Sequence, residues 1–213
     1  TTEIYTLSLH DALPIFPSHF MQTQNGEYLV TGTNDGFDFS SNDLYLLKID
    51  ANGNKIWDKK NRAHMGKYGF SALELANGDL LICGNHNVNW SGQVLLVKTD
   101  NLGNVYWEKE IGDSNLSENG NSVKQNLDGT FTIAGSSYDI NTTSDDIILL
   151  KVDQNGNQIW FKKFGSSAIN WGINLIKDNN DDNIVTGTTF NYDSDKSNDV
   201  IFMTKVDNNG NFK

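Results

Sequence analysis

The stretch KIDANGNKIW, residues 48–57, decides the fold because close copies of it recur along the chain. The copies read VKTDNLGNVYW up to Trp107, LKVDQNGNQIW up to Trp160, and TKVDNNGNFK up to Lys213. Their turn glycines are spaced 50, 53 and 54 residues apart, at Gly53, Gly103, Gly156 and Gly210. A period of this length is typical of propellers, solenoids and repeat arrays.

A second motif keeps the same period and predicts a β-hairpin in each repeat. Its copies are NGEYLVTG up to Gly32, NGDLLICG up to Gly84, DGTFTIAG up to Gly135 and NDDNIVTG up to Gly187. Asn-Gly and Asp-Gly favour two-residue hairpin turns because glycine accepts a positive φ. In the fourth repeat Asn180-Asp181 stands in this place, and asparagine and aspartate also tolerate that backbone conformation.

Each repeat reads as four short antiparallel strands, and the third is apolar without interruption, as in LYLLKID and IILLKVD. An unbroken apolar strand indicates burial on both faces. The sequence therefore predicts an all-β fold, a β-propeller of about four blades forming an open arc of a larger disc. Turn signals every few residues exclude a helical repeat, and a two-sheet sandwich is the alternative.

The expected organisation treats residues 1–15 separately, because TTEIYTLSLHDALPI matches the translation of a common sequencing adapter over its whole length. We interpret residues 1–15 as non-native and residues 16–213 as a partial β-propeller. The expected blades cover residues 18–69, 70–121, 122–172 and 173–213, the last one incomplete. Missing blades of the same chain are then expected partners, and residues 16–213 alone are expected to self-associate.

Composition excludes several classes of function. The formal net charge is −11 and Arg62 is the single arginine, so no basic cluster for nucleic acid is present. No apolar run is long enough to span a bilayer. Cys83 stands alone within the apolar stretch LLICG, which predicts a small buried side chain and no disulfide framework.

The repeated residues are expected to be structural. The aspartates should accept backbone hydrogen bonds and close their turns, while the tryptophans should pack between neighbouring blades. A calcium loop is disfavoured, since counting from Asp153 the sixth and twelfth positions hold Gln158 and Phe164 instead of glycine and glutamate. The structural set is Asp50, Gly53, Trp57, Asp100, Gly103, Trp107, Asp153, Gly156, Trp160, Asp207 and Gly210.

On these residues the chain resembles secreted bacterial β-propeller repeat proteins, whose pattern is K-x-D-x-x-G-N-x-x-W followed by a D-G-G-x-x-x-x-G hairpin. The resemblance covers residues 20–213. It implies an extracellular or outer cell-surface location, often reached by type IX secretion. A second resemblance, to the sialidase Asp-box S-x-D-x-G-x-x-W, lacks the serine and has longer spacings. The arginine cluster that sialidase chemistry needs is also absent.

Binding residues are expected where long, varied loops gather, because variable loops on a rigid scaffold carry recognition. The loop after the second strand and the crossover to the next blade share one face of the disc, which we call the long-loop face. Aromatic residues there that the repeat does not require are candidates for glycan or peptide contacts. They are Phe37, Phe39, Tyr68, Trp90, Tyr138, Trp171, Phe190 and Tyr192. The alternative is that they cover the ends of the blades.

No cofactor and no catalytic residue is predicted. The chain has no G-x-S-x-G, H-E-x-x-H or glycine-rich phosphate motif. Should a Ca²⁺ ion bind, the candidate ligands are Asp193, Asp195 and Asp199; DNNDDN at 178–183 is expected to be a solvated hairpin end.

The predicted function is a non-enzymatic extracellular scaffold that displays loops for binding or adhesion, with a glycan or protein as ligand. The alternative is part of a propeller-type glycan hydrolase or lyase, whose paired carboxylates lie partly on other blades. The sequence leaves the ligand and the total number of blades open.

Overall fold

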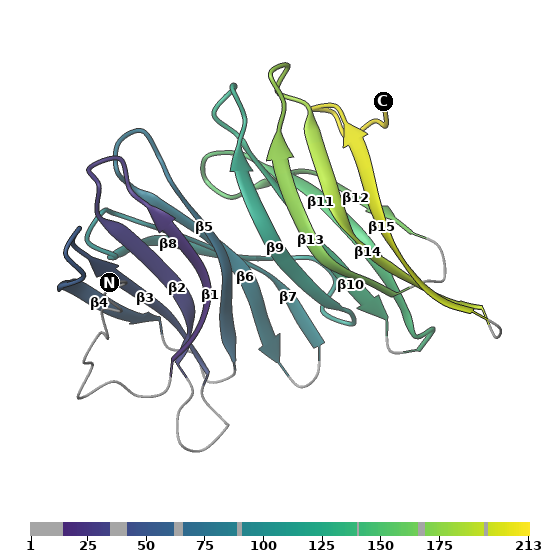
Figure 1. The fold of residues 1–213 in the computed structure, drawn as a ribbon, viewed down its shortest axis with the longest axis horizontal. Coiled ribbons are helices and arrows are strands. Elements are labelled where there is room, and N and C mark those ends of the chain that lie inside the picture. The colour runs from purple at the N-terminus through teal and green to yellow at the C-terminus, as the bar shows by residue number, and fades with distance from the viewer. Residues whose placement is uncertain are drawn as a thin grey trace, which may run out of the picture.

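The computed structural model describes residues 15–34, 42–61, 66–88, 91–139, 141–165, 169–193 and 196–213. Every regular element in these ranges is a β-strand, and the strands form four blades arranged in an arc (Figure 1). Within the described residues no helix is long and apolar enough to cross a membrane. The prediction of an all-β propeller arc is confirmed.

Each of the first three blades is an antiparallel sheet of four consecutive strands. Blade 1 contains β1 (Ile15–Gln22), β2 (Tyr28–Asn34), β3 (Asp43–Ile49) and β4 (Lys55–Asn61). Blade 2 contains β5 (Lys67–Glu74), β6 (Leu80–Val88), β7 (Ser91–Thr99) and β8 (Val105–Ile111). Blade 3 contains β9 (Ser117–Gln125), β10 (Phe131–Asp139), β11 (Ser144–Val152) and β12 (Gln158–Phe164).

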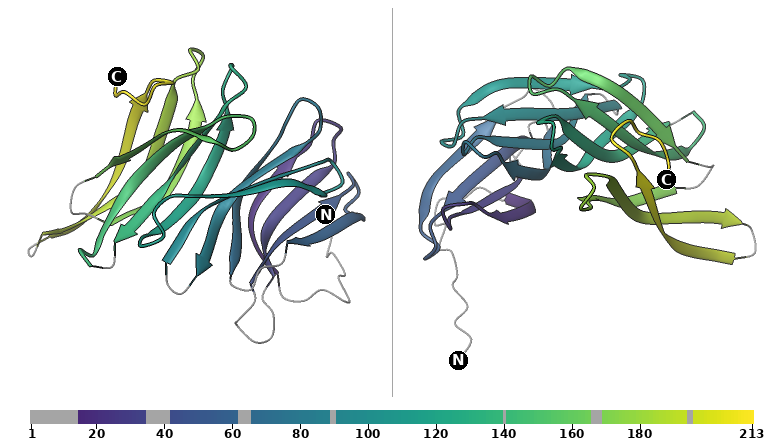
Figure 2. Two further views of the ribbon diagram at one scale, coloured as in Figure 1. Left: turned by 180° about the vertical axis from the view of Figure 1, so that it is seen from behind. Right: turned by 90° about the horizontal axis from the view of Figure 1, so that it is seen from above.

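Blade 4 is a three-stranded sheet of β13 (Ile169–Lys177), β14 (Asn183–Asp193) and β15 (Lys196–Val206). An isolated bridge between Val206 and Phe212 continues it. Blades 2 and 3 are also joined, through one parallel bridge between Gly92 and Ser117. Seen from above, the blades fan out along a curve with blades 1 and 4 at its two ends (Figure 2).

The innermost strands begin earlier than the expected blade limits, which fall inside β5, β9 and β13. The pairing of β5 with β6 shifts register between Gly69 and Ser71, and the pairing of β9 with β10 shifts at the same place in the repeat. A β-bulge lets a strand continue beyond the irregular residue. Gly69, at the expected end of the first blade, therefore lies within β5.

In blades 1 to 3 the third strand is buried on both faces, as the apolar runs predict. In blade 4 the prediction is wrong for one face, because Ile201 and Met203 of β15 are 82% and 75% exposed. In β3, Leu44, Tyr45, Leu46 and Leu47 are at most 5% exposed. Three of the four apolar clusters of the described residues lie between blades, and the fourth lies within blade 1. One joins blades 1 and 2, another joins blades 2 and 3, and a third joins blades 3 and 4.

The tryptophans pack between blades, as predicted. Trp57, Trp107 and Trp160 are half-buried and lie against the three inter-blade clusters in turn. The indole of Trp160 also donates a hydrogen bond to the backbone oxygen of Asn208, in the next blade, at 3.3 Å. The indoles therefore hold neighbouring sheets together.

The turn aspartates also behave as predicted. One Asp50 oxygen accepts hydrogen bonds from the backbone N–H groups of Asn52, at 2.9 Å, and Asn54, at 2.8 Å, and the other accepts from the Asn54 side chain. The other three repeats show the same pattern around Asp100, Asp153 and Asp207. Both carboxylate oxygens are thus hydrogen-bonded within their own turn, so a structural role explains why an aspartate recurs in every repeat.

Candidate functional site

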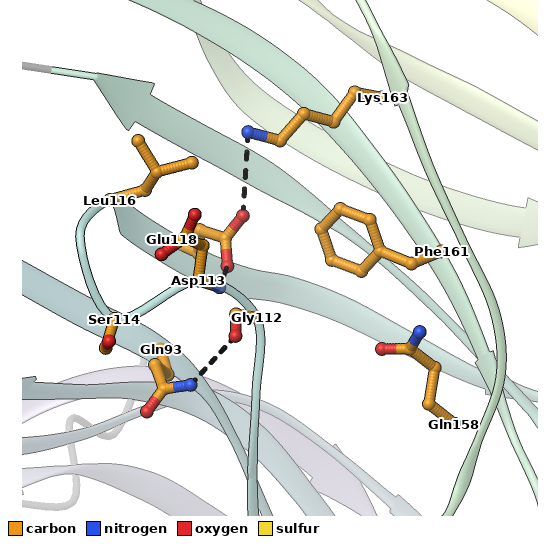
Figure 3. Close-up of a pocket in the computed structure, with 9 residues that line it drawn as sticks. All are labelled: Gln93, Gly112, Asp113, Ser114, Leu116, Glu118, Gln158, Phe161 and Lys163. Carbon is orange, nitrogen blue, oxygen red and sulfur yellow. Dashed lines mark hydrogen bonds and ion pairs between the residues drawn. The ribbon is translucent and has the colours of Figure 1, made fainter.

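A cleft of about 760 Å³ lies between blades 2 and 3, beside the crossover that connects β8 to β9 (Figure 3). Small-molecule sites in proteins have volumes of roughly 300–1,000 Å³, so this cleft is large enough for a ligand. The crossover belongs to the long-loop face, where binding residues are expected. The lining residues are Gln93, Gly112, Asp113, Ser114, Leu116, Glu118, Gln158, Phe161 and Lys163.

Glu118 fixes the floor of the cleft. It lies on β9 near the start of the strand and is only 1% exposed. One carboxylate oxygen accepts a hydrogen bond from the Asp113 backbone N–H at 2.7 Å, and the other accepts from the Ser137 hydroxyl at 3.1 Å. The Lys163 ammonium lies 3.7 Å from the second oxygen (Figure 3). Glu118 therefore holds the crossover in place through its hydrogen bond with the Asp113 backbone.

The crossover can approach Glu118 only because residue 112 is glycine. Its φ is 130°, and a Cβ atom there would lie within 1.7 Å of a Glu118 carboxylate oxygen. The Gly112 carbonyl is held from the other side by the Gln93 side chain, which donates a hydrogen bond at 3.0 Å. Two strands, β7 through Gln93 and β9 through Glu118, thus position one short loop.

The pKa values of the two acids at this loop, Glu118 and Asp113, are shifted in opposite directions. Burial raises the pKa of the Glu118 carboxyl above its ordinary value. The Asp113 carboxylate is exposed, and hydrogen bonds from the Asn115 backbone and side chain lower its pKa. Asp113 therefore presents a fixed negative charge at the rim, while Glu118 is shielded from solvent.

The rest of the lining combines one aromatic ring with several donors and acceptors. Phe161 is half-buried against the cluster between blades 2 and 3 and forms an apolar wall. Lys163 extends from the same strand and offers an ammonium group, while Gln93 and Ser114 lie across the cleft and offer an amide and a hydroxyl group (Figure 3). An aromatic face next to polar groups fits a ligand with both apolar and hydroxyl-bearing surfaces.

The corresponding place between blades 1 and 2 is filled by its own polar groups. Lys67 occupies the same repeat position as Glu118, and its ammonium lies 2.5 Å from a Glu108 oxygen and 3.2 Å from the Asn61 side-chain oxygen. The Asn61 amide donates to the other Glu108 oxygen at 2.8 Å. Because these groups satisfy one another, the blade 2–3 boundary is the better candidate site.

Two of the predicted aromatic residues are described with their side chains, and neither lines the cleft. The Tyr68 hydroxyl accepts a hydrogen bond from the Asn42 amide at 2.5 Å, and its ring stacks near Phe70. Tyr138 is half-buried on β10. Phe37, Phe39 and Trp90 lie outside the described residues. The strands that carry Trp171, Phe190 and Tyr192 are described, but their side chains are not.

The calcium candidates remain untested. Asp195 lies outside the described residues, and the side chains of Asp193 and Asp199 are not described. Across the described ranges, no three His, Cys, Asp or Glu side chains gather closely enough to hold a metal ion. In the hairpin of residues 178–183, Asp178 and Asp182 pair with Lys205. Asp182 also pairs with Lys213. Asp181 and Asp182 are at most 8% exposed, so the expectation of a solvated hairpin end is wrong for these residues.

Sequence reasoning missed Phe161, Lys163 and Glu118. One signal was present, because the residue after the repeat tryptophan is Asp58 in blade 1 and Glu108 in blade 2 but Phe161 in blade 3. An aromatic side chain in place of an acid marks a departure from the repeat. The role of Glu118 had no such signal, since it depends on the path of the crossover above it.

Comparisons with known proteins identify the fold and no family. No family model and no curated protein matches the chain. Several solved structures are similar to it in fold. A protein of unknown function from Dyadobacter fermentans has a TM-score of 0.64 at 11% identity, over 95% of this chain and 69% of that one.

Two further structures are also similar. The endo-arabinase from Bacteroides thetaiotaomicron has a TM-score of 0.61 at 9% identity, over 99% of this chain and 82% of the enzyme. A protein of unknown function from Bacteroides caccae has a TM-score of 0.53 at 14% identity, over 92% of this chain. The present chain spans 62% of that protein's length. At these identities the likeness shows a common fold alone.

Proposed function

We propose that this propeller is a glycan-binding protein and that the cleft between blades 2 and 3 holds one or more sugar units. The observation that carries the proposal is that the Phe161 ring lines the same cleft as the polar side chains of Gln93, Ser114 and Lys163 (Figure 3). A pyranose or furanose ring has an apolar face that stacks on an aromatic ring and hydroxyls that need donors and acceptors at its edge.

The proposed setting is extracellular or at the outer cell surface. The resemblance to secreted bacterial propeller repeats supports it, as does the fold shared with an endo-arabinase. The eight off-repeat aromatic residues remain proposed as ligand contacts of the long-loop face.

Binding is favoured over cleavage by the burial of Glu118. A general acid must reach the glycosidic oxygen of its substrate, whereas Glu118 is 1% exposed and its oxygens are engaged by Asp113 and Ser137. Glu118 is therefore proposed as a positioning residue that supports the crossover, and the protein as a non-enzymatic binder.

Glycoside cleavage is the second candidate function. The endo-arabinase shares this fold, and so does a GH43_12 protein from a capybara gut metagenome, with a TM-score of 0.53 at 12% identity. The opposite pKa shifts of Glu118 and Asp113 also resemble an acid–base pair. Release of reducing sugar from arabinan, abolished by Glu118→Gln, would favour this function over binding alone.

The binding proposal is tested by glycan-array screening of the chain, followed by calorimetric titration with the best oligosaccharide. Lys163→Ala and Gln93→Ala are each expected to weaken binding about tenfold, since each removes a hydrogen bond worth roughly 1–1.5 kcal/mol. Lys162→Ala is the matched control, because Lys162 lies on the same strand but reaches Asn211 on the blade 4 side. Equal loss in both lysine variants, or no retained glycan, would contradict the proposal.

A further inference from the structure

The cleft between blades 2 and 3 contains few ionisable side chains. Of the nine residues that line it, Asp113, Glu118 and Lys163 are the ones whose side chains ionise near neutral pH. The cleft therefore holds two carboxylates and one ammonium group, and its other polar side chains are uncharged. This balance bears on ligand choice, because glycans differ from one another in charge as well as in shape.

The ammonium group of Lys163 is already balanced by Glu118. Its nitrogen lies 3.7 Å from one Glu118 oxygen (Figure 3). Both Glu118 oxygens also accept hydrogen bonds, from the Asp113 backbone and the Ser137 hydroxyl, and such bonds stabilise the ionised carboxyl group. Because Glu118 is 1% exposed, moving the ammonium group to a ligand would leave a buried carboxylate without its counter-ion. The pair therefore contributes little net charge to the cleft.

The carboxylate of Asp113 is the charge that remains. It is exposed at the rim, and one of its oxygens accepts hydrogen bonds from the Asn115 backbone N–H, at 2.9 Å, and from the Asn115 side chain, at 2.8 Å. Among the described residues no side chain forms an ion pair with Asp113. Asp139 lies near enough to raise the negative potential further. The rim thus carries a fixed negative charge without a counter-ion.

We propose that the cleft selects uncharged glycans over glycans that carry carboxylate or sulfate groups, and that Asp113 determines this selectivity. The inference rests on the proposed glycan-binding function and names the ligand class of that site. An anionic sugar would bring a second negative charge close to Asp113 without gaining a free cation, and like charges brought together at an interface are disfavoured. The hydroxyl groups of an uncharged sugar can accept from Lys163 while it stays near Glu118, since an ammonium group has three donors.

The charge of the whole chain acts in the same direction. The formal net charge is −11, so an approaching polyanion is repelled at long range. This long-range repulsion does not depend on any single residue, whereas the effect of Asp113 is local to the cleft. Substitutions at two separate aspartates therefore distinguish the two contributions.

The first test is a glycan array on which each uronic-acid oligosaccharide is printed as the free acid and as its methyl ester. Esterification removes the charge and keeps the sugar rings and their linkages. We expect the full chain to retain uncharged glycans and to bind no free acid as tightly as its ester. Free acids retained as well as their esters would overturn the selectivity and leave the glycan-binding function standing. Retention of no glycan at all would contradict that function, and this inference with it.

The second test measures the selectivity with one matched pair of ligands. The shortest oligosaccharide retained on the array is converted to its alditol and to its aldonic acid, which differ in a single −CH2OH or −COO− group. In calorimetric titrations at about 0.05 M salt, the alditol is expected to bind at least about fivefold more tightly. At about 1 M salt the difference should shrink, because the Debye length falls to roughly 3 Å. Equal affinities at low salt would overturn the proposal.

The variant Asp113→Asn tests the residue itself. It removes the charge and keeps a side-chain oxygen that can accept the hydrogen bonds from Asn115. We expect the ratio of the alditol affinity to the aldonate affinity to fall at least about threefold, because the local repulsion is lost.

Asp100→Asn is the matched control for this variant. It changes the net charge by the same amount, and Asp100 also accepts hydrogen bonds within its own turn, at the opposite end of β8 from the crossover. Its affinity ratio should equal that of the native chain. An unchanged ratio in Asp113→Asn, or an equal fall in both variants, would overturn the role of Asp113.

Discussion

The turn glycines illustrate, at the scale of single residues, how the repeat couples one blade to the next. A Cβ atom on Gly103 would lie 3.1 Å from the Trp57 ring of the preceding blade, and one on Gly156 would lie 2.8 Å from the Trp107 ring. Each glycine therefore serves two purposes. It permits the positive φ of the turn and it leaves room for the neighbouring indole.

Gly156→Ala should destabilise the protein more than Gly53→Ala. Both residues have a positive φ, of 76° and 86°, so both variants strain the backbone. Only the methyl group at residue 156 meets an indole, whereas nothing lies within 4 Å of the one at residue 53. We expect an additional loss of about 1–3 kcal/mol for Gly156→Ala, the usual cost of overpacking. Urea unfolding of both variants measures it, and equal losses would contradict the inter-blade role of the glycine.

At the same scale, the repeat lysines Lys48, Lys98, Lys151 and Lys205 lie two residues before the turn aspartates. The structure pairs each of them with an acid of the hairpin in its own blade. Lys48 lies 2.6 Å from Glu27, Lys151 lies 2.9 Å from Asp128, and Lys205 lies 2.6 Å from Asp178. The lysine and the hairpin acid are therefore one structural unit, which links the first turn of a blade to its third strand.

At the scale of elements, the crossover from β8 to β9 is the part of the molecule that makes the cleft. Its hydrogen bonds to the flanking strands include those from Asp113 to Glu118, from Gln93 to Gly112 and from the Gly92 N–H to the Leu116 carbonyl. Because Glu118 is buried, its loss cannot be made good by water without rearrangement.

Glu118→Ala is expected to loosen the crossover and to cost about 1–3 kcal/mol, the usual penalty for leaving buried donors unpaired. Hydrogen exchange of the Asp113 amide should accelerate at least about tenfold, since each 1.4 kcal/mol is a factor of ten. Glu110→Ala is the control, because Glu110 is exposed and pairs with His86 at 2.7 Å away from the cleft. Unchanged exchange at Asp113 in Glu118→Ala would show that the crossover is held by other contacts.

At the scale of the whole molecule, acids on the two faces of the arc respond to pH in opposite ways. Hydrogen bonds from Asn54 lower the pKa of Asp50 below its ordinary value of 3.8, and the other turn aspartates share this direction. Burial, reinforced by the nearby Asp146, raises the pKa of Asp145 to about 6.

The melting temperature should therefore be highest near about pH 4, and fall on either side of it. A lowered folded-state pKa contributes stability that is complete above the unfolded value of 3.8 and is lost as the pH falls through the folded value. A raised pKa acts oppositely, so ionisation of Asp145 costs stability as the pH rises from 3.8 toward about 6. Thermal melts from about pH 2 to 8 measure both parts of this profile, the loss of stability at low pH and the loss as the pH rises toward about 6.

The variant Asp145→Asn separates the two parts of the pH profile. This variant should keep the loss of stability at low pH and flatten the decline between about pH 4 and 6, because the amide does not ionise. An unchanged profile would show that Asp145 does not titrate in this range.

Much of the fold could be predicted from the sequence because a propeller repeats local rules. The glycine turns, the doubly buried third strand and the positive φ of Asp181, at 62°, each follow from a few adjacent residues. The start of the innermost strands could not be predicted, because pairing continues across the bulge near Gly69. Tertiary hydrogen bonding decided that boundary.

By itself, the sequence determined that four units of β-strands stack with indoles between them, since the period and the turn residues carry that information locally. Only the tertiary structure decided where a ligand could enter. Gln93, Glu118 and Phe161 lie on three strands far apart in the chain, and they surround one cleft because the crossover passes between two blades. A periodic pattern predicts the features that all blades share, whereas this cleft depends on residues in which blade 3 differs from the other blades.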